Sequence, residues 1–370
     1  MSTVSQFDRI FWKSLDINKN VYEGNDYLPE IYSQWMAEKN RDNFVILNSS
    51  NDVVGFFSLS NYEVDDYKVF VEQALRLRAD ILGNNLSKLV IQWVDKFIKK
   101  KSTKALLLSV ACFHDHDASY EQAMETENQN RIHKYMRGSD TRNVLDIGLF
   151  VEVAVNDYTA QLLRTSKKTL QVIDTNCIFT ELKSMDFCNL PKVKKYNAHI
   201  LKQYWYPFMI NHSSSMDKLF NPVNSPVLNN MAQVRALRSD DVFSIGALCP
   251  TGVDGKWIVS IDVYGESHED YIDHLKEHFT FFEQSNRDIF NIHLNLPNID
   301  QIEKTEFNKE LSKVKKGPVW FTPVFFNDIT QKWINLEVRF RKTYGRLYSA
   351  KGGRDDVPIY GTNAIRSQSG

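Results

Sequence analysis

The sequence predicts a mixed α/β fold built from two similar halves. Strand-like and helix-like segments alternate as strand–helix–strand–helix–strand at residues 68–153, and the same order returns at 257–326. Three strand-like runs with polar turns precede the first of these stretches, which is typical of an antiparallel meander. With 370 residues, 42% of them hydrophobic and 25% charged, the chain is long enough for two domains of ordinary globular composition.

The first half begins with a helix, predicted over residues 28–39. Pro29 suits its first turn, and an apolar stripe at helical spacing follows. Three strands come next, separated by the turn-rich segments 48–52 and 64–66. These strands are predicted at Phe44–Leu47, Val53–Ser60 and Lys68–Leu77.

The third strand runs into a polar loop at 78–87 and then into a helix that ends near Lys100. Its apolar residues recur every three or four positions, and Lys99–Lys101 lies at its end, where positive charge suits the helix dipole. A solvated helix end is the plain interpretation of these lysines; contact with a phosphate group of a ligand is the alternative. A strand, a charged helix and a long strand follow, at Ala105–Cys112, Glu121–Met136 and Arg142–Val153.

The middle region, about 155–240, has helical pieces and an aromatic cluster at 204–208, which either packs between the halves or lines a ligand site. The second half then has strands at Asp241–Cys249, Trp257–Tyr264, Ile289–Leu296, Val319–Phe326 and Trp333–Arg341, and helices after Ser267 and at Ile299–Val314. Ser267 and Asp270 form a capping-box pattern. The predicted domains are 1–155, a connecting region 156–240, a second half 241–348 and a flexible tail 349–370.

Charge and cysteine usage exclude several classes of function. The net charge is -1, from 45 basic and 46 acidic residues, so a nucleic-acid partner is not expected. The start lacks a signal-peptide pattern and no apolar run reaches membrane-spanning length, which predicts a cytoplasmic protein without a membrane partner. The four cysteines are scattered, and no metal is expected. His114–Asp117 contains metal-ligand residue types, but a solvated turn is the preferred interpretation.

The loop around Gly83 is the main candidate for a binding site. A strand that enters a glycine-containing loop and then a helix can present backbone N–H groups and a helix N-terminus to a phosphate. Gly83, Asn84 and Asn85 are the residue types that most readily adopt positive φ. An ordinary helix start is the alternative.

The order of elements resembles the GNAT acetyltransferase fold, and four segments resemble the histidine N-acetyltransferase family. They are Val21–Pro29 with its Gly-Asn-Asp-Tyr-Leu-Pro run, Val71–Leu77, Gln203–Phe208 and Gly255–Gly265. The matches occur in the family's order and are spread over most of residues 20–310.

The resemblance implies transfer of acetyl from acetyl-CoA, the co-substrate, to the α-amine of free histidine or a similar small amine. It assigns Glu72 as the base, with an ordinary strand residue as the alternative, and Tyr135 as the acid, with a packing aromatic as the alternative. The coenzyme would be held by the strand and loop residues Leu75, Leu77, Leu82, Gly83, Asn84, Asn85 and Ser87. The sequence does not predict an oligomeric state.

The coenzyme loop departs from the family pattern, Arg/Gln-x-x-Gly-x-Gly/Ala. Leu82, Asn85 and Ser87 stand at its fixed positions, and one extra residue after Glu72 predicts a bulge in the strand. A degenerate GNAT-fold binding protein is therefore the alternative function. At the equivalent junction of the second half, Glu266, Glu269 and Asp270 would repel a pyrophosphate, so only the first half is expected to bind coenzyme A.

Overall fold

The computed structural model divides into two compact units, Met1–Leu107 with Asp328–Gly370 (unit 1) and Leu108–Asn327 (unit 2). It describes residues 17, 26–64, 67–81, 86–110, 143–156, 159–160, 163, 170–173, 192–193, 198–209, 225, 227–229, 231–240, 242–265, 268–296, 313, 320–328 and 347–349. Residues 1–155, predicted above as one domain, are thus divided between the units; the domain boundaries stay a prediction.

Unit 1 carries the predicted meander. Its strand order is β15-β1-β2-β3-β4, and β15, β1, β2 and β3 pair antiparallel. The bounds are β1 (Arg41–Leu47), β2 (Val53–Val64), β3 (Tyr67–Leu77), β4 (Ala105–Val110, in this unit to Leu107) and β15 (Leu347–Ser349). The Lys68 N–H donates to the Lys104 carbonyl at 3.0 Å, which joins the start of β3 to the residue before β4.

The β1–β2 turn forms where the sequence predicts it. The Asn48 side-chain oxygen accepts the N–H groups of Ser50 and Asp52 at 3.0 and 2.8 Å, and Asn51 has a φ of 62°. An asparagine both closes such a turn through its side chain and tolerates the left-handed conformation, so the residue types explain the turn.

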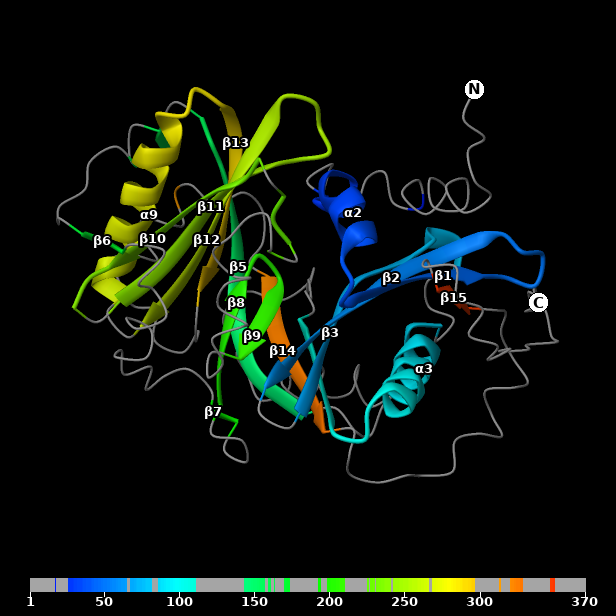
Figure 1. The fold of residues 1–370 in the computed structure, drawn as a ribbon. Coiled ribbons are helices and arrows are strands. Elements are labelled where there is room, and N and C mark those ends of the chain that lie inside the picture. Colours follow the sequence, from blue (N-terminus) through cyan, green and yellow to red (C-terminus); the bar gives the residue numbers. More distant parts are fainter. Residues whose placement is uncertain are drawn as a thin grey trace, which may run out of the picture. The chain divides into compact units, whose positions relative to one another are not determined.

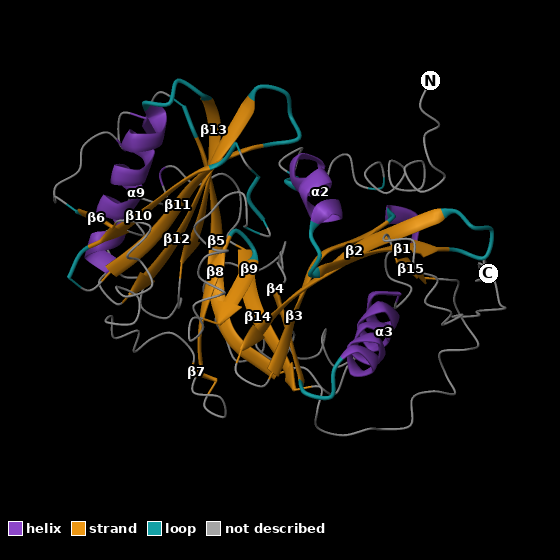
Figure 2. Cartoon of the chain, in the orientation of Figure 1, coloured by secondary structure: helices purple, strands orange, loops and turns teal. Residues whose placement is uncertain are grey.

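Two helices of unit 1 are described, α2 (Leu28–Ala37) and α3 (Leu86–Lys101), with a 3-10 turn η2 (Ala79–Ile81) before α3 (Figure 2). Helix α3 packs the side chains of Val90, Trp93, Val94, Phe97 and Ile98 into one core with the strands. In that core Phe44 stacks on Phe57 with ring centroids 4.8 Å apart and meets Trp93 edge-on at 5.0 Å. The helical stripe read from the sequence is therefore the face that packs on the meander.

Unit 2 has the strand order β14-β5-β13-β12-β11-β10-β6 and a separate sheet β7-β8-β9 (Figure 1). The bounds are β5 (Asn143–Ala154), β6 (Gln171–Ile173), β7 (Lys192–Val193), β8 (Ala198–Gln203), β9 (Tyr206–Met209), β10 (Gln233–Arg238), β11 (Val242–Pro250), β12 (Lys256–Gly265), β13 (Asp288–Leu296) and β14 (Trp320–Asp328), with helix α9 (His268–Glu283). Strand β12, α9 and β13 form a strand–helix–strand crossover, and β12 pairs parallel with β13.

Strand β5 lies between two strands of the second half. It pairs antiparallel with β13, where Leu294 is opposite Val151, and antiparallel with β14, where Trp320 is opposite Phe150. By sequence β5 follows β4 of the first half. The first half thus contributes a strand to the middle of the second unit's sheet.

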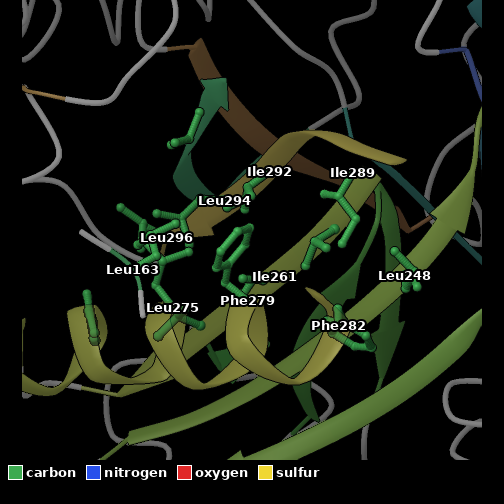
Figure 3. Close-up of a cluster of buried hydrophobic side chains, with 14 of the residues drawn as sticks. Leu163, Leu248, Ile261, Leu275, Phe279, Phe282, Ile289, Ile292, Leu294 and Leu296 are labelled. Carbon is green, nitrogen blue, oxygen red and sulfur yellow. The ribbon is translucent and has the colours of Figure 1, made fainter. Parts of the chain in front are cut away.

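The core of unit 2 lies between α9 and one face of its sheet. Figure 3 shows Leu275, Phe279 and Phe282 of α9 beside Ile261 of β12 and Ile292 and Leu294 of β13. All six side chains are buried. The strand residues of this core alternate with polar residues; they are 261 and 263 of β12 and 292, 294 and 296 of β13. The opposite face of these two strands therefore carries polar side chains.

A series of hydrogen-bonded polar side chains lies under α9. The Ser244 hydroxyl lies 2.6 Å from Nδ1 of His274 and 2.8 Å from Nε2 of His278, and His274 Nε2 lies 3.3 Å from the Ser239 hydroxyl. Gly246 leaves room for these side chains, because a Cβ there would overlap the His278 ring. Burial lowers the pKa of His278 well below its ordinary value, and His274 and Arg235 add to the effect, so this histidine is neutral.

The sequence predicts both ends of β3, β4, β5, β11, β12, β13 and β14 within two residues, whereas β1 begins three residues earlier and β2 ends four residues later than predicted. The short strand β15 and the strands of the middle region are not predicted. The region 155–240 contains β10, which pairs with β11, and the β8–β9 hairpin. The turn of this hairpin is formed by Tyr204 and Trp205 of the aromatic cluster at 204–208. The predicted helices at 121–136 and 299–314, the strand at 333–341 and the tail from 350 fall wholly or almost wholly outside the described residues. No helix in the described part of the chain is long and apolar enough to cross a membrane.

Candidate active site

The structure places part of the predicted site on β3. Glu72, Leu75 and Leu77 lie on this strand, and Ser87 is the second residue of α3. Leu82, Gly83, Asn84, Asn85 and Tyr135 lie outside the described residues, as does the possible metal-binding turn at 114–117.

The predicted bulge in β3 is confirmed. Ser58 of β2 is opposite Gln73, but Phe56 is opposite Arg76, so β3 has one more residue than β2 between these pairs. Ala74 takes a φ of 53° within the bulge. A bulge bends its strand and redirects side chains, and it is found preferentially next to functional sites.

Glu72 comes two residues before Ala74 and is 7% exposed. Its cross-strand partner is Leu59, and Leu59 and Phe70 both belong to the core that α3 covers. Because side chains alternate along a strand, Glu72 is on the α3 side of the sheet and Gln73 is on the other side. The carboxylate is thus on the same side as the helix that follows the predicted coenzyme loop.

The opposite side of the sheet carries a buried arginine that sequence reasoning did not single out. Arg41 is fully buried and donates to the Ser58 hydroxyl and the Gln73 side-chain oxygen, each at 2.9 Å, and to Glu38 at 2.8 Å. Its guanidinium lies 3.9 Å from the Trp35 ring centroid. A single arginine at the start of a strand gives no sequence signal for burial, because its partners come from three separate elements.

The Gly-Asn-Asp-Tyr-Leu-Pro run has a structural role at the start of α2. Asp26 accepts the Leu28 N–H at 3.1 Å and forms a two-bond ion pair with Arg76 of β3. The Arg76 guanidinium also lies 5.6 Å from the Tyr27 ring, and burial raises the Tyr27 pKa. Asp26 and Tyr27 therefore link the start of α2 to the bulged strand β3 through Arg76.

The two helix starts differ in charge as the sequence predicts. Helix α3 has no acidic residue in its first turn, whereas α9 begins His268-Glu269-Asp270. A helix N-terminus binds anions through its free N–H groups and dipole, and carboxylates there oppose a phosphate. This difference in charge agrees with the expectation that only the first half binds coenzyme A, which stays a prediction.

Comparison with known proteins places the fold. No protein-family model matches the sequence, and no curated protein is a significant match. A tandem GNAT protein from the clavulanic acid biosynthesis pathway is similar in structure, with a TM-score of 0.50 and 8% identity over 88% of this chain and 97% of that one. GCN5-related N-acetyltransferases from Sphaerobacter thermophilus (TM-score 0.46, 8% identity, 89% and 93% covered) and Anabaena variabilis (0.39, 13%, 88% and 71%) also match.

The comparison with the tandem protein spans nearly the full length of both chains, so it includes both halves. The chain therefore has the GNAT acetyltransferase fold with a second GNAT-like half.

Proposed function

We propose that the protein is an N-acetyltransferase that uses acetyl-CoA and acts in unit 1. The observation that carries the proposal is the succession along the chain of bulged strand β3, η2 and helix α3, whose first turn has no acidic residue, in a chain with a tandem GNAT fold. The bulge frees part of the strand's backbone from its ladder, and such groups suit the amides of a pantetheine arm.

In the proposed reaction, acetyl-CoA supplies an acetyl group as a thioester, and the acceptor nitrogen forms a bond to its carbonyl carbon while the carbon–sulfur bond breaks. Glu72 takes one proton from the acceptor ammonium, which gives the free amine that attacks. Tyr135 gives its proton to the departing thiolate and regains one from the nitrogen of the adduct, which becomes the amide. Backbone groups around Leu75 and Leu77 and in the 82–87 loop hold and orient the coenzyme. The products are the N-acetyl amine and free coenzyme A.

The proposed acceptor is free histidine or a similar small amine. This follows from the resemblance of Val21–Pro29, Val71–Leu77, Gln203–Phe208 and Gly255–Gly265 to the histidine N-acetyltransferase family. The first of these segments contributes Asp26 and Tyr27, which lie against Arg76 on the side of β3 opposite Glu72. A panel of amino acids, read by release of free thiol, identifies the acceptor.

Binding of acetyl-CoA is the first test. Calorimetry with the full chain is expected to give one binding event per chain. Lack of binding at about 1 mM coenzyme, an affinity weaker than about -4 kcal/mol, would reject the proposal and favour a degenerate GNAT-fold binding protein. The departures at Leu82, Asn85 and Ser87 are the sequence feature that supports this second function.

Replacing Glu72 tests its role as base. Glu72→Gln keeps the shape of the side chain and is expected to lower kcat by about 100-fold or more, with loss of the acidic limb of the pH profile. Glu63→Gln is the matched control, because Glu63 is an exposed carboxylate on the neighbouring strand β2. An unchanged rate and pH profile in Glu72→Gln, with coenzyme binding intact, would remove Glu72 from the mechanism.

A further inference from the structure

The face of the unit 2 sheet opposite α9 carries an unusual group of buried polar side chains. Ser260 and Asp262 of β12 are 1% exposed, and His293 and Asn295 of β13 are 5% exposed. Ser260 is in register with His293, and Asp262 with Asn295, so the four residues form two adjacent rows on one face. On the next strand, Glu152 is opposite His293.

The turn of the β8–β9 hairpin covers this group. The Tyr204 N–H donates to Oδ2 of Asp262 at 3.3 Å, and the Tyr204 ring is stacked on His293 with centroids 6.2 Å apart. Trp205 packs on Phe150 of β5 at 4.8 Å. We call Gln203, Ser260, Asp262, His293 and Asn295 the β12–β13 polar cluster.

The turn that covers the cluster is strained. Gln203 and Tyr206 are paired, so Tyr204 and Trp205 form a two-residue hairpin turn, and their φ values are 43° and 72°. Such turns normally use Asn-Gly, because positive φ is strained in most other residues. Two bulky aromatics are kept here despite that cost, and strain of this kind is concentrated at ligand sites.

Several polar atoms of the cluster lack a hydrogen-bond partner among the described residues. They are both amide atoms of Gln203, the Ser260 hydroxyl and the Asn295 amide nitrogen. Gln203 is 1% exposed, and leaving buried polar groups of this kind without a hydrogen bond lowers stability. The cluster thus offers both donors and acceptors to a small polar molecule.

The charge of the cluster selects the kind of molecule. Asp262 and Glu152 are carboxylates, and the positions in register with the cluster on β11, β12, β13 and β5 carry neither lysine nor arginine. The Asp262 carboxylate also contributes to raising the pKa of the buried Cys249 thiol, after the larger effect of burial. A cationic group is favoured beside two carboxylates, and an anionic group is opposed.

We propose that the β12–β13 polar cluster is a binding site for a small organic amine that carries a second, uncharged hydrogen-bonding group. The ammonium lies against Asp262 and the Gln203 side-chain oxygen, and the second group accepts from the amides of Asn295 and Gln203. The Tyr204–Trp205 turn closes the site. This proposal uses residues of unit 2 alone and does not depend on the proposed acetyl transfer.

Binding of histamine and ethanolamine to the full chain, without acetyl-CoA, tests the proposal by calorimetry. At least one of them is expected to bind with a Kd of about 1 mM or below. L-Histidine adds a carboxylate to the histamine framework and is expected to bind this site at least about tenfold more weakly, because like charges oppose each other. If L-histidine still binds to the Asp262→Asn variant with unchanged affinity, that binding is at another site and is not evidence about the β12–β13 polar cluster.

Two variants locate the site. Asp262→Asn keeps an acceptor for the Tyr204 N–H and is expected to weaken amine binding about 30-fold. Ser260→Ala is expected to weaken it about fivefold, and serves if Asp262→Asn does not fold. Asp288→Asn is the matched control, because Asp288 is an exposed carboxylate of β13 paired with Lys256, and its affinity is expected to equal that of the wild type.

Three results would overturn the proposal. The first is no binding of either amine at about 10 mM, weaker than about -3 kcal/mol, with the fold intact by circular dichroism. The second is equal binding by the wild type and Asp262→Asn. The third is tighter binding of L-histidine than of histamine that Asp262→Asn abolishes, since this would mean that the site selects the zwitterion.

Discussion

At the scale of single residues, the Asp26–Arg76 ion pair is the link between the conspicuous N-terminal motif and the bulged strand. The two side chains are 14% and 6% exposed, so water screens them little. Removing one partner of a buried pair leaves the other charge without compensation, which is more harmful than losing the attraction itself. Replacing Asp26 is therefore expected to lower the stability of the fold, whether or not it also affects the reaction.

Asp26→Ala is expected to lower the free energy of unfolding of unit 1 by about 3 kcal/mol. Denaturant unfolding followed by tryptophan fluorescence measures the change. Asp80→Ala is the control, because Asp80 pairs with Arg78 at 2.6 Å in an exposed position, and no measurable change is expected there. Equal effects of the two substitutions would contradict the structural role given to Asp26.

His278 is expected to make unit 2 sensitive to acid. Its pKa in the folded chain is well below 6.5, so between that value and about 6.5 the unfolded chain binds one more proton than the folded chain. Stability is therefore present above pH 6.5 and falls as the pH drops below it, by up to about 1.4 kcal/mol per pH unit. His278→Gln, whose amide nitrogen can still reach Ser244, is expected to flatten the dependence of Tm on pH between about 7 and 5. The same slope in wild type and variant would remove His278 as the cause.

At the scale of elements, the sequence predicts what local chemistry determines. The meander of β1, β2 and β3 follows from alternating side chains and from the Asn48 turn, and the bulge follows from one extra residue after Glu72. The β8–β9 hairpin was missed because Tyr204 and Trp205 are not turn residues, and their positive φ is imposed by contacts with Asp262, His293 and Phe150. Of the candidate site, the sequence predicts the strand that carries Glu72, whose role as base stays a prediction, but not the buried Arg41 or the β12–β13 polar cluster, whose members meet only in the folded chain.

Replacing Tyr204 and Trp205 by Asn and Gly is expected to separate stability from binding. Asn-Gly suits positive φ at both turn positions, so relief of strain favours the variant by roughly 1–2 kcal/mol, against the loss of the two aromatic contacts. The net change in Tm is expected to be small. Amine affinity at the β12–β13 polar cluster is expected to fall at least about tenfold, because the cover of the site is gone. Unchanged affinity would show that the turn has no part in binding.

At the scale of the whole molecule, β5 makes the two halves of the sequence interdependent within unit 2. This strand carries sequence from the first half but has β13 and β14 as its two neighbours. The sequence predicts β5 as a strand from its alternating pattern, but a pattern does not name the partners of a strand. Pairing between residues more than 130 positions apart, such as Asn291 with Glu152 at a separation of 139, depends on the fold as a whole.

A fragment of residues 1–155 is expected to leave β5 unpaired. In the full chain the amides of β5 are expected to be protected from hydrogen exchange by ladders on both edges, and in the fragment they are expected to exchange as in an unfolded chain. Exchange measured by mass spectrometry on peptides covering 143–154 distinguishes the two. Full protection in the fragment would mean that β5 has another partner in the first half.

The position of β5 also determines how long this strand waits for its partner strands while the ribosome synthesises the chain. Its two neighbours end at Leu296 and Asp328, so 174 residues separate the end of β5 at Ala154 from the end of β14 (328 minus 154). At roughly 5–20 residues per second, about 9–35 s pass before both neighbours of β5 have been synthesised, and until then at least one edge of β5 is open. An open strand edge is a template for pairing with other chains. The nascent chain is therefore exposed to aggregation for nearly half of its translation, and slowing elongation between residues 154 and 328 is expected to lengthen its association with ribosome-bound chaperones.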